Sequence, residues 1–131
     1  MKNYTQNYRV KYFDVDARNE IKVSNLMDLL LDLSNRQMEE SQLGTEELFK
    51  RNLGWVVTQY HFEVKRLPKA NENVSLETTE SGYNKYFCYR DFWVKDDAGE
   101  AMIYVRSLWI IMDLTSRKMV RLDEGLGEMM A

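Results

Sequence analysis

The sequence of 131 residues contains one cysteine, one histidine and one proline, and these scarcities exclude several classes of protein. A single Cys88 cannot form a disulfide within the chain, and no Cys/His cluster has the spacing of a structural zinc site. We therefore expect no metal, no other cofactor and a reducing, cytoplasmic location. The sequence also has no run of about 18 apolar residues and no apolar stretch near Met1, so we expect neither a membrane-spanning helix nor a secretion signal.

The charge balance is close to even, with 18 basic and 21 acidic residues and a formal net charge of −3. This balance gives no overall electrostatic footprint for nucleic acid or an anionic membrane, and we expect neither as a partner. Hydrophobic residues make up 44% of the chain, and a chain of this length buries roughly two-thirds of its unfolded surface. We therefore predict a single globular domain over residues 1–131.

The first third of the chain predicts a strand followed by a long helix. Residues 8–15 mix aromatic and β-branched residues and end in an acidic, turn-prone stretch, as in a strand that runs into a loop. Ser24 is the expected N-cap of the helix, and Gly44 is the expected residue after its last turn. Between them the apolar residues recur at the three-to-four spacing of one buried helix face: Leu26, Met27, Leu29, Leu30, Leu33 and Met38.

A short helix and several strands are predicted after Gly44. Thr45 is expected to cap the short helix, with Leu48 and Phe49 packed inward. Beyond Gly54 the apolar residues alternate, which predicts a half-buried strand with Val56, Tyr60, Phe62 and Val64 on one face. Further strands are predicted at 74–79, 86–95, 101–114 and 119–122, and the turn at 96–99 joins two of them as a hairpin.

The predicted strand at 101–114 is apolar on both of its faces, unlike the others. A strand of this kind is covered on both sides. Since one long helix covers only one face of a sheet, we expect the other face to meet another domain, a partner subunit or an apolar ligand. One long helix with several antiparallel strands predicts an α+β architecture.

Four segments allow a narrower comparison with known families: YRVKYFDVDARNEIKVSNLMDLL, NLGWVVTQYHFEV, SGYNKYFCYRDFWVKDDAGE and SLWIIMDLTSRKMVR. The order of the predicted elements resembles the hotdog fold, and the four segments together resemble the first half of the acyl-ACP thioesterases. The resemblance spans about residues 4–122. It implies one hotdog domain, in which a curved antiparallel sheet of about five or six strands wraps around one long central helix.

In that family two hotdog repeats lie in one polypeptide, so the resemblance implies a second repeat after this one. The family hydrolyses the thioester that joins a fatty acyl group to the phosphopantetheine arm of acyl carrier protein. Its catalytic Asp, Asn and His lie in the second repeat. The resemblance therefore implies that this chain supplies the acyl-binding half and is inactive alone. Its implied partners are acyl carrier protein and either a second hotdog domain or a homodimer partner.

A second hypothesis makes the chain an autonomous, homodimeric thioesterase for acyl-CoA or acyl-ACP. Single-hotdog thioesterases carry a segment similar to Asp-x-x-Gly-His-Val-Asn-Asn after the first strand, and residues 16–23 align with it here. Asp16 is kept, but the Gly, the His and both Asn positions are replaced, so Asp16 and Glu20 are the catalytic candidates. A carboxylate acts as a general base only beside an attacking water and donors for the oxyanion. The competing interpretation is that Asp14 and Asp16 stabilise the loop.

Acyl binding, with or without hydrolysis, is predicted for one face of the long helix and the start of the strand after Gly54. Methionine is flexible, and apolar side chains with a few polar groups suit an alkyl pocket. The predicted substrate-binding residues are Met27, Leu30, Ser34, Met38, Trp55 and Val57. Ordinary core packing explains the same pattern, and a non-catalytic acyl-binding or dimerising module is the third hypothesis.

Four further features of the sequence have structural or surface interpretations. His61 lies on the polar face of its strand without a nucleophile at an interpretable spacing, which argues against a catalytic role. Cys88 lies in the middle of a predicted strand and is interpreted as a core residue. Because acyl carrier protein is acidic, basic clusters are candidate docking sites, although solvated surface is the stronger explanation, since short basic runs are common at strand ends. These clusters are Lys65, Arg66 and Lys69, and Arg117, Lys118 and Arg121.

Overall fold

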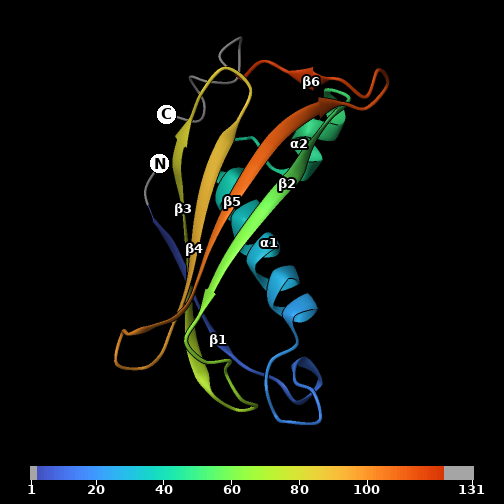
Figure 1. Cartoon of the computed structure of the whole chain (residues 1–131). Coiled ribbons are helices and arrows are strands. Elements are labelled where there is room, and N and C mark those ends of the chain that lie inside the picture. Colours follow the sequence, from blue (N-terminus) through green and yellow to red (C-terminus); the bar gives the residue numbers. More distant parts are fainter. Residues whose placement is uncertain (1–2, 123–131) are drawn as a thin grey trace.

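A computed structural model describes residues 3–122, in which one antiparallel sheet curves around a long helix (Figure 1). The strands are β1 (Tyr4–Arg9), β2 (Leu53–Val64), β3 (Asn73–Tyr83), β4 (Cys88–Lys95), β5 (Ala101–Asp113) and β6 (Met119–Val120). Their order is β1-β3-β4-β5-β2, and β6 pairs with the end of β5. The helices are α1 (Val23–Glu40), α2 (Thr45–Lys50) and a 3-10 turn, η1 (Tyr12–Asp14). This arrangement confirms the predicted α+β hotdog architecture.

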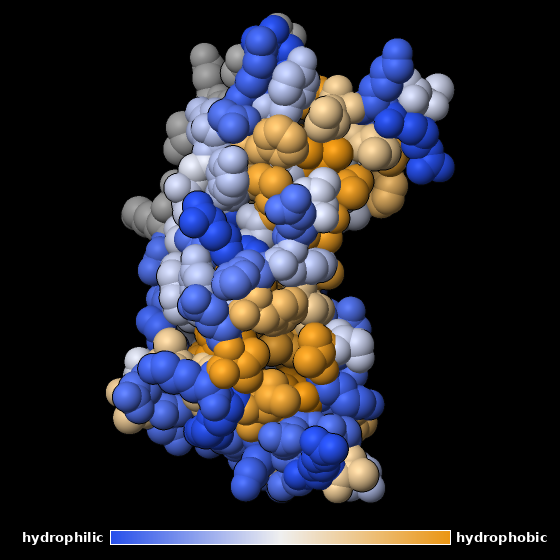
Figure 2. All heavy atoms as spheres, viewed as in Figure 1, coloured by the Kyte–Doolittle hydropathy of each residue, from blue (hydrophilic) through white to orange (hydrophobic). Residues whose placement is uncertain are grey.

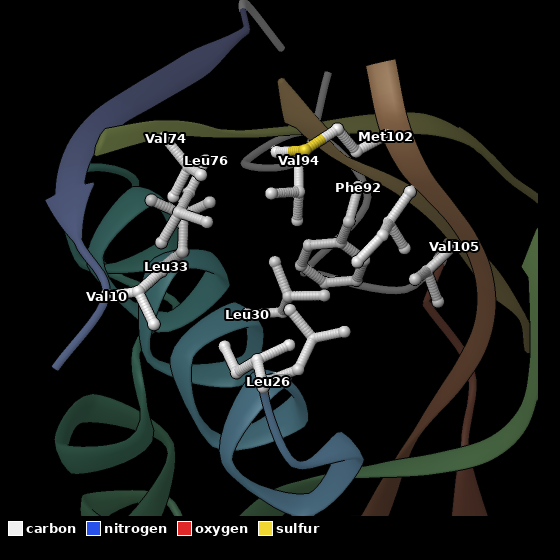
Figure 3. Packing of buried hydrophobic residues seen from close by; sticks show 12 residues of the cluster. Val10, Leu26, Leu30, Leu33, Val74, Leu76, Phe92, Val94, Met102 and Val105 are labelled. Carbon is white, nitrogen blue, oxygen red and sulfur yellow. The ribbon is translucent and has the colours of Figure 1, made fainter. Parts of the chain in front are cut away.

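The main core forms where the leucine face of α1 packs on the sheet (Figure 3). Leu26, Leu30 and Leu33 have at most 1% of their surface exposed, and Phe92 from β4 has none. Burial of each such side chain contributes roughly 1.5–3 kcal/mol to folding. The other buried members are Val10, Ile21, Val74, Leu76, Val94, Met102, Ile103 and Val105.

The first strand is earlier and shorter than residues 8–15. β1 ends at Arg9, which is the last residue paired with β3. The chain then turns, because the backbone N–H of Asp14 donates to the carbonyl of Lys11 at 2.9 Å and closes η1. The predicted strand therefore covers the end of β1 and the whole of η1.

The start of α1 differs from the prediction that Ser24 caps it. The N-cap is Lys22, whose carbonyl accepts the N–H of Leu26 at 2.9 Å, and the helix begins at Val23. The N–H of Lys22 donates to the carbonyl of Asp14 at 2.8 Å. Because this bond to the preceding turn fixes where the chain enters the helix, Ser24 falls inside the first turn.

The end of α1 also differs from the prediction. Gln42, at φ 59°, takes the left-handed position after the helix, and the N–H of Leu43 donates to the carbonyl of Met38 at 2.9 Å. Gly44 has φ −67° and is instead the N-cap of α2. Its lack of a side chain is needed for close packing, because a Cβ there would lie 2.6 Å from Cγ of Glu39.

The short helix α2 is present, but two details of its prediction are wrong. Leu48 is fully buried as expected, whereas Phe49 is 61% exposed because it lies on the outer side of the single turn. Thr45 does not cap α2. Its backbone N–H and its hydroxyl both donate to Oδ1 of Asn35, at 2.8 and 3.0 Å, and so tie α2 to α1.

A β-bulge in β2 changes which side chains of this strand face the core. The register of β2 against β5 shifts between Val57 and Gln59, so Thr58 is an extra residue. An extra residue inverts the alternation of side chains beyond it. Phe62 packs against the main core, and Val57, not Val56, shares that side of the sheet. The predicted common face for Val56 and Phe62 is therefore wrong.

Replacing Leu30 with alanine tests the packing of α1 on the sheet. We expect Leu30→Ala to lower the free energy of unfolding by about 2–5 kcal/mol, because it removes a fully buried side chain and leaves a cavity. Urea denaturation followed by circular dichroism measures this change. Val64→Ala, at a position that is 49% exposed, is the control and should change stability by no more than about 0.5 kcal/mol. Equal losses in the two variants would contradict the assignment of the core.

Candidate functional site

A cavity of about 220 Å³ lies between α1 and the part of the sheet formed by β4, β5 and the start of β2. Four of the predicted acyl-binding residues line it: Ser34, Met38, Trp55 and Val57. The other lining residues are Leu31, Asn35, Thr45, Cys88, Arg90 and Trp109. Most of this wall is apolar, as in pockets that bind small apolar ligands.

Two tryptophans form one side of the cavity. The rings of Trp55 and Trp109 meet edge to face, with centroids 6.2 Å apart and planes at 90°. The indole N–H of Trp55 donates to the carbonyl of Leu43 at 3.0 Å, and that of Trp109 donates to Oγ of Ser107 at 2.7 Å. Since both indole donors are satisfied by the protein, the rings are held in fixed positions along the wall.

Arg90 is a charged residue in the cavity wall that the sequence analysis did not identify. It is 2% exposed, and one of its Nη atoms donates to Oε1 of Gln37 at 2.6 Å and to Oγ1 of Thr78 at 3.1 Å. Burial lowers the pKa of the guanidinium, while neighbouring Cys88 and Glu80 oppose that shift. Arg90 lies two residues after the buried Cys88 and two before the buried Phe92, on the same face of β4. This strand alternation was the sign in the sequence that Arg90 points inward.

Cys88 lies next to Arg90 on the same side of β4 and is 1% exposed. Burial raises the pKa of its thiol to about 12, and the nearby charge of Arg90 only partly opposes this effect. The thiol is therefore protonated at neutral pH and is a poor nucleophile. This environment confirms the interpretation of Cys88 as a core residue, and its contribution to the cavity is small, apolar surface.

The cavity opens between α1 and β2. Ser34, Met38, Cys88 and Arg90 have at most 5% of their surface exposed and form the floor. The other lining residues are partly or fully exposed, and we call them the mouth: Leu31, Asn35, Thr45, Trp55, Val57 and Trp109. Figure 2 shows apolar side chains gathered on the side of the molecule where β2 and α1 lie in Figure 1. The mouth thus lies at the edge of the sheet that β2 forms.

Met27 and Leu30, the other two predicted acyl-binding residues, do not line the cavity. Leu30 has no exposed surface and belongs to the main core, and Met27 packs against that core. Both precede Ser34 along α1, by about 10 and 6 Å at the helical rise per residue. They therefore contact the sheet nearer the start of the helix, where leucine side chains fill the space.

Asp16 and Glu20, the candidate catalytic residues, lie in a tight turn after η1. One carboxylate oxygen of Asp16 accepts the backbone N–H groups of Arg18 and Glu20, at 2.9 and 3.2 Å. The backbone N–H of Asp16 donates to the carbonyl of Glu20 at 2.9 Å. These bonds are those of an aspartate that stabilises a turn, as the competing interpretation predicted. A catalytic role for either residue stays a prediction.

Asp14 connects β1, η1 and α1 through its buried carboxylate. Oδ2 accepts the Tyr8 hydroxyl at 2.5 Å and the Lys11 N–H at 2.9 Å, and Oδ1 accepts the Asn25 amide at 3.2 Å. Burial raises the pKa of Asp14, but these hydrogen bonds outweigh burial and hold the pKa below its ordinary value. Burial and the neighbouring carboxylate raise the pKa of Tyr8 to about 12. Asp14 is therefore an ionised brace of the loop.

His61 lies away from the cavity, on a strand position where its side chain is 69% exposed. Its nearest charged partner is Glu63, at 3.8 Å. Within residues 3–122, no group of three or more His, Cys, Asp or Glu side chains is arranged to hold a metal ion. In the same part of the chain, no helix is long and apolar enough to cross a membrane.

The curved sheet, the single long helix and the apolar cavity between them define the chain as an α+β hotdog domain. It matches the model of the acyl-ACP thioesterase N-terminal domain over residues 1–130. The chain belongs to the acyl-ACP thioesterase family.

The similar proteins include plant and bacterial thioesterases. Palmitoyl-acyl carrier protein thioesterase of Arabidopsis thaliana is 26% identical over 128 residues, which cover 92% of this chain and 31% of that protein. A Lactobacillus plantarum structure named as an oleoyl thioesterase is 32% identical, with a TM-score of 0.92 over 98% of this chain and 50% of its own. An acyl-ACP thioesterase from Bacteroides thetaiotaomicron is 25% identical, with a TM-score of 0.84 over 90% of this chain and 49% of its own. The chain thus spans about a third to a half of these proteins.

Replacing Asp14 with asparagine tests how much the hydrogen bonds of its carboxylate stabilise the fold, and how this contribution depends on pH. We expect Asp14→Asn to lower the free energy of unfolding by about 1.5–3 kcal/mol at pH 7, because it removes a buried charge that accepts three hydrogen bonds. The pKa of Asp14 is lower in the folded state than in the unfolded state, so its contribution is complete above about pH 4 and is lost as the pH falls further. The difference between the two proteins should therefore shrink in acid.

Urea denaturation at pH 7 and at several pH values below 4 measures this difference. Asp28→Asn, on the exposed side of α1, is the control and should stay within about 0.5 kcal/mol of the wild type at pH 7. A difference for Asp14→Asn that is constant across the whole pH range would show that the lost interaction does not depend on the carboxylate charge.

Proposed function

We propose that this chain supplies the acyl-binding half of an enzyme that hydrolyses acyl-ACP thioesters in fatty acid biosynthesis. The observation that carries the proposal is the cavity between α1 and β2, with its apolar wall and buried floor. The names of the relatives support the reaction class, since they are thioesterases of acyl carrier protein esters.

In this proposal the alkyl chain of the substrate enters at the mouth and ends at the floor. Each buried methylene contributes about 0.8 kcal/mol, so a cavity of fixed depth discriminates between acyl chains by their length. The tryptophan pair and the bonded Arg90 resist displacement, because their polar groups already have partners inside the protein. The depth of the cavity is therefore set by fixed side chains.

The hydrolytic groups are proposed to come from a second hotdog repeat. Attack on a thioester needs a base beside a water molecule and donors for the oxyanion. In this chain the Asp16 carboxylate accepts hydrogen bonds from its own turn, and His61 is exposed on β2. Neither residue lines the cavity. This geometry favours the half-enzyme over the autonomous homodimer.

We propose that the second hotdog repeat, or a second copy of this chain, pairs with β2. In residues 3–122 this strand is hydrogen-bonded to β5 alone, so its other edge carries unpaired backbone groups. Tyr60 and Val64 on this strand are 40% and 49% exposed. Because the mouth of the cavity is bordered by the same strand, a partner at this edge would cover the entrance.

A hydrolysis assay distinguishes the half-enzyme from the two alternative hypotheses. We expect the purified chain alone to bind acyl-ACP and acyl-CoA of several chain lengths without measurable turnover, and we expect turnover once a second hotdog repeat is present in the same polypeptide. Light scattering on the same sample gives the mass of the active species. Turnover by the chain alone that Asp16→Asn abolishes, with the fold retained, would establish the autonomous enzyme instead. Binding without turnover in the longer polypeptide would establish the non-catalytic module.

Narrowing the mouth tests whether the cavity holds the acyl chain. We expect Val57→Trp to weaken binding of long-chain acyl thioesters by at least about 10-fold, since its side chain would occupy the entrance, and to change binding of a short-chain thioester by less than about 2-fold. Titration calorimetry measures both. Val56→Trp is the matched control, because the neighbouring residue lies on the other face of β2. If the two variants weaken long-chain binding equally, the cavity is not the acyl site.

A further inference from the structure

One end of the molecule carries three exposed apolar side chains close together. Tyr12 and Phe13 in η1 are 87% and 62% exposed, and Val23 at the start of α1 is 52% exposed. The bond from the N–H of Lys22 to the carbonyl of Asp14 holds the start of α1 against η1. We call this region, formed by residues 9–23 and 65–72, the end surface.

The two segments of the end surface lie side by side. The N–H of Ala70 donates to Oδ1 of Asn19 at 3.1 Å, and the N–H of Ile21 donates to the carbonyl of Pro68 at 2.9 Å. Together they contain seven Lys and Arg residues and four Asp and Glu residues, in a chain whose formal net charge is −3. The end surface is therefore positive although the chain is negative.

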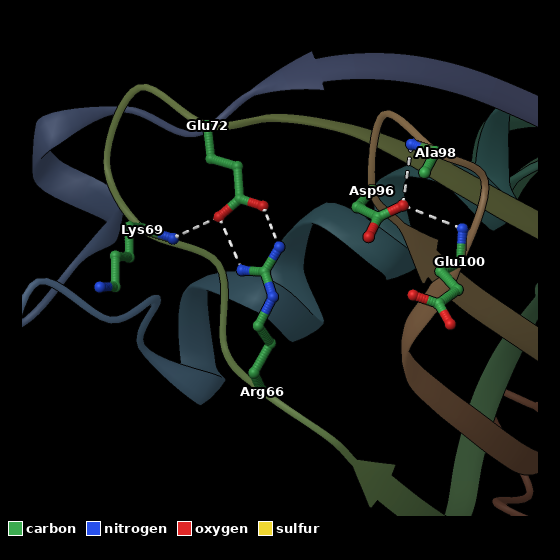
Figure 4. A network of polar contacts seen from close by, with 6 residues as sticks. All are labelled: Arg66, Lys69, Glu72, Asp96, Ala98 and Glu100. Carbon is green, nitrogen blue, oxygen red and sulfur yellow. Dashed lines mark hydrogen bonds and ion pairs between the residues drawn. The ribbon is translucent and has the colours of Figure 1, made fainter.

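Three of the four acidic residues already have partners inside the end surface. Asp14 is buried in its hydrogen bonds, and Asp16 accepts two backbone N–H groups. Glu72 accepts two hydrogen bonds from the Arg66 guanidinium, at 2.9 and 2.5 Å, and one from the N–H of Lys69 at 3.1 Å (Figure 4). Arg66, one of the predicted docking residues, is thus neutralised locally.

Six of the seven cations of the end surface are exposed, and in the described residues none of the six lies within 4.0 Å of a carboxylate oxygen: Arg9, Lys11, Arg18, Lys22, Lys65 and Lys69. The Lys11 ammonium lies 5.6 Å from the centroid of the Phe13 ring and 5.7 Å from that of Tyr8. The positive charge is therefore held beside the exposed aromatic side chain. An apolar centre with a charged rim is the usual composition of a protein interface.

We propose that the end surface docks acyl carrier protein, the acidic protein that presents the acyl group; this inference rests on the proposed function. Charge complementarity selects the partner, because unpaired cations steer an acidic protein and orient it. A second copy of this chain fits poorly, since a two-fold contact would bring the same cations together. Val23 is about 12 Å along α1 from Leu31 at the mouth, so a carrier docked here has its prosthetic arm beside the cavity.

Charge reversal at Lys11 and Lys22 tests the docking surface. The probes are an acyl carrier protein that bears a non-hydrolysable acyl group, and the same acyl-pantetheine without the protein. We expect the double variant K11E/K22E to raise the dissociation constant for the acyl carrier protein by about 10-fold at low salt, and the wild-type affinity to fall as salt is added. The affinity for acyl-pantetheine should change by less than about 2-fold. The charge-matched control is R117E/K118E, at the other predicted basic cluster.

Four other results would overturn the docking proposal in distinguishable ways. Failure of the wild-type chain to bind either probe would reject the proposed function together with it. Binding of both probes with no effect of K11E/K22E would reject the docking surface alone, and so would a selective loss in R117E/K118E. A change in the oligomeric mass of K11E/K22E would assign the surface to a second copy. Circular dichroism of each variant confirms that these exposed substitutions leave the fold intact.

Discussion

The packing of one face of α1 against the sheet is the interaction on which the rest of the structure depends. From the first turn to just past the middle of the helix this face carries Leu26, Leu30 and Leu33, which pack against the sheet and have at most 1% of their surface exposed. In the second half it carries the small Ser34 and the flexible Met38, and the space that they leave is the cavity. The same amphipathic face therefore anchors the helix at one end and forms a binding wall at the other.

Two carboxylates in the loop after β1 form hydrogen bonds that hold the loop in shape. The Asp14 carboxylate accepts three hydrogen bonds, which connect β1, η1 and α1. The Asp16 carboxylate accepts two backbone N–H groups of the next turn. Lys11 and Lys69 interact electrostatically with Asp14 and Glu72, but in the described residues neither lysine lies within 4.0 Å of a carboxylate oxygen. The end surface keeps an excess of positive charge, because it has seven basic and four acidic residues.

Periodicity predicted the order and type of the main elements, because α1 and β4 each bury one regular set of positions. It failed where one residue depends on a distant contact. Thr58 forms a bulge that sequence alternation cannot show, and Gly44 serves close packing on Glu39 although glycine predicts a helix end. Four of the six predicted acyl-binding residues line the cavity, and the other two were wrong for a related reason. Leu30 and Ser34 lie on one helical face, but only the sheet opposite determines which of them lines a space.

If a second repeat pairs with β2 as we propose, the position of the mouth couples ligand binding to partner binding. An acyl chain in the cavity would leave some apolar surface in water, because Trp55 and Val57 are themselves partly exposed. Free energy of burial scales with the area removed from water, so a repeat that pairs with β2 and covers the mouth would bind the acylated form more tightly. By linkage, the acyl group would then bind more tightly to the paired form, by the same factor. In a polypeptide that contains both halves, the acyl chain would therefore stabilise the contact between the two repeats.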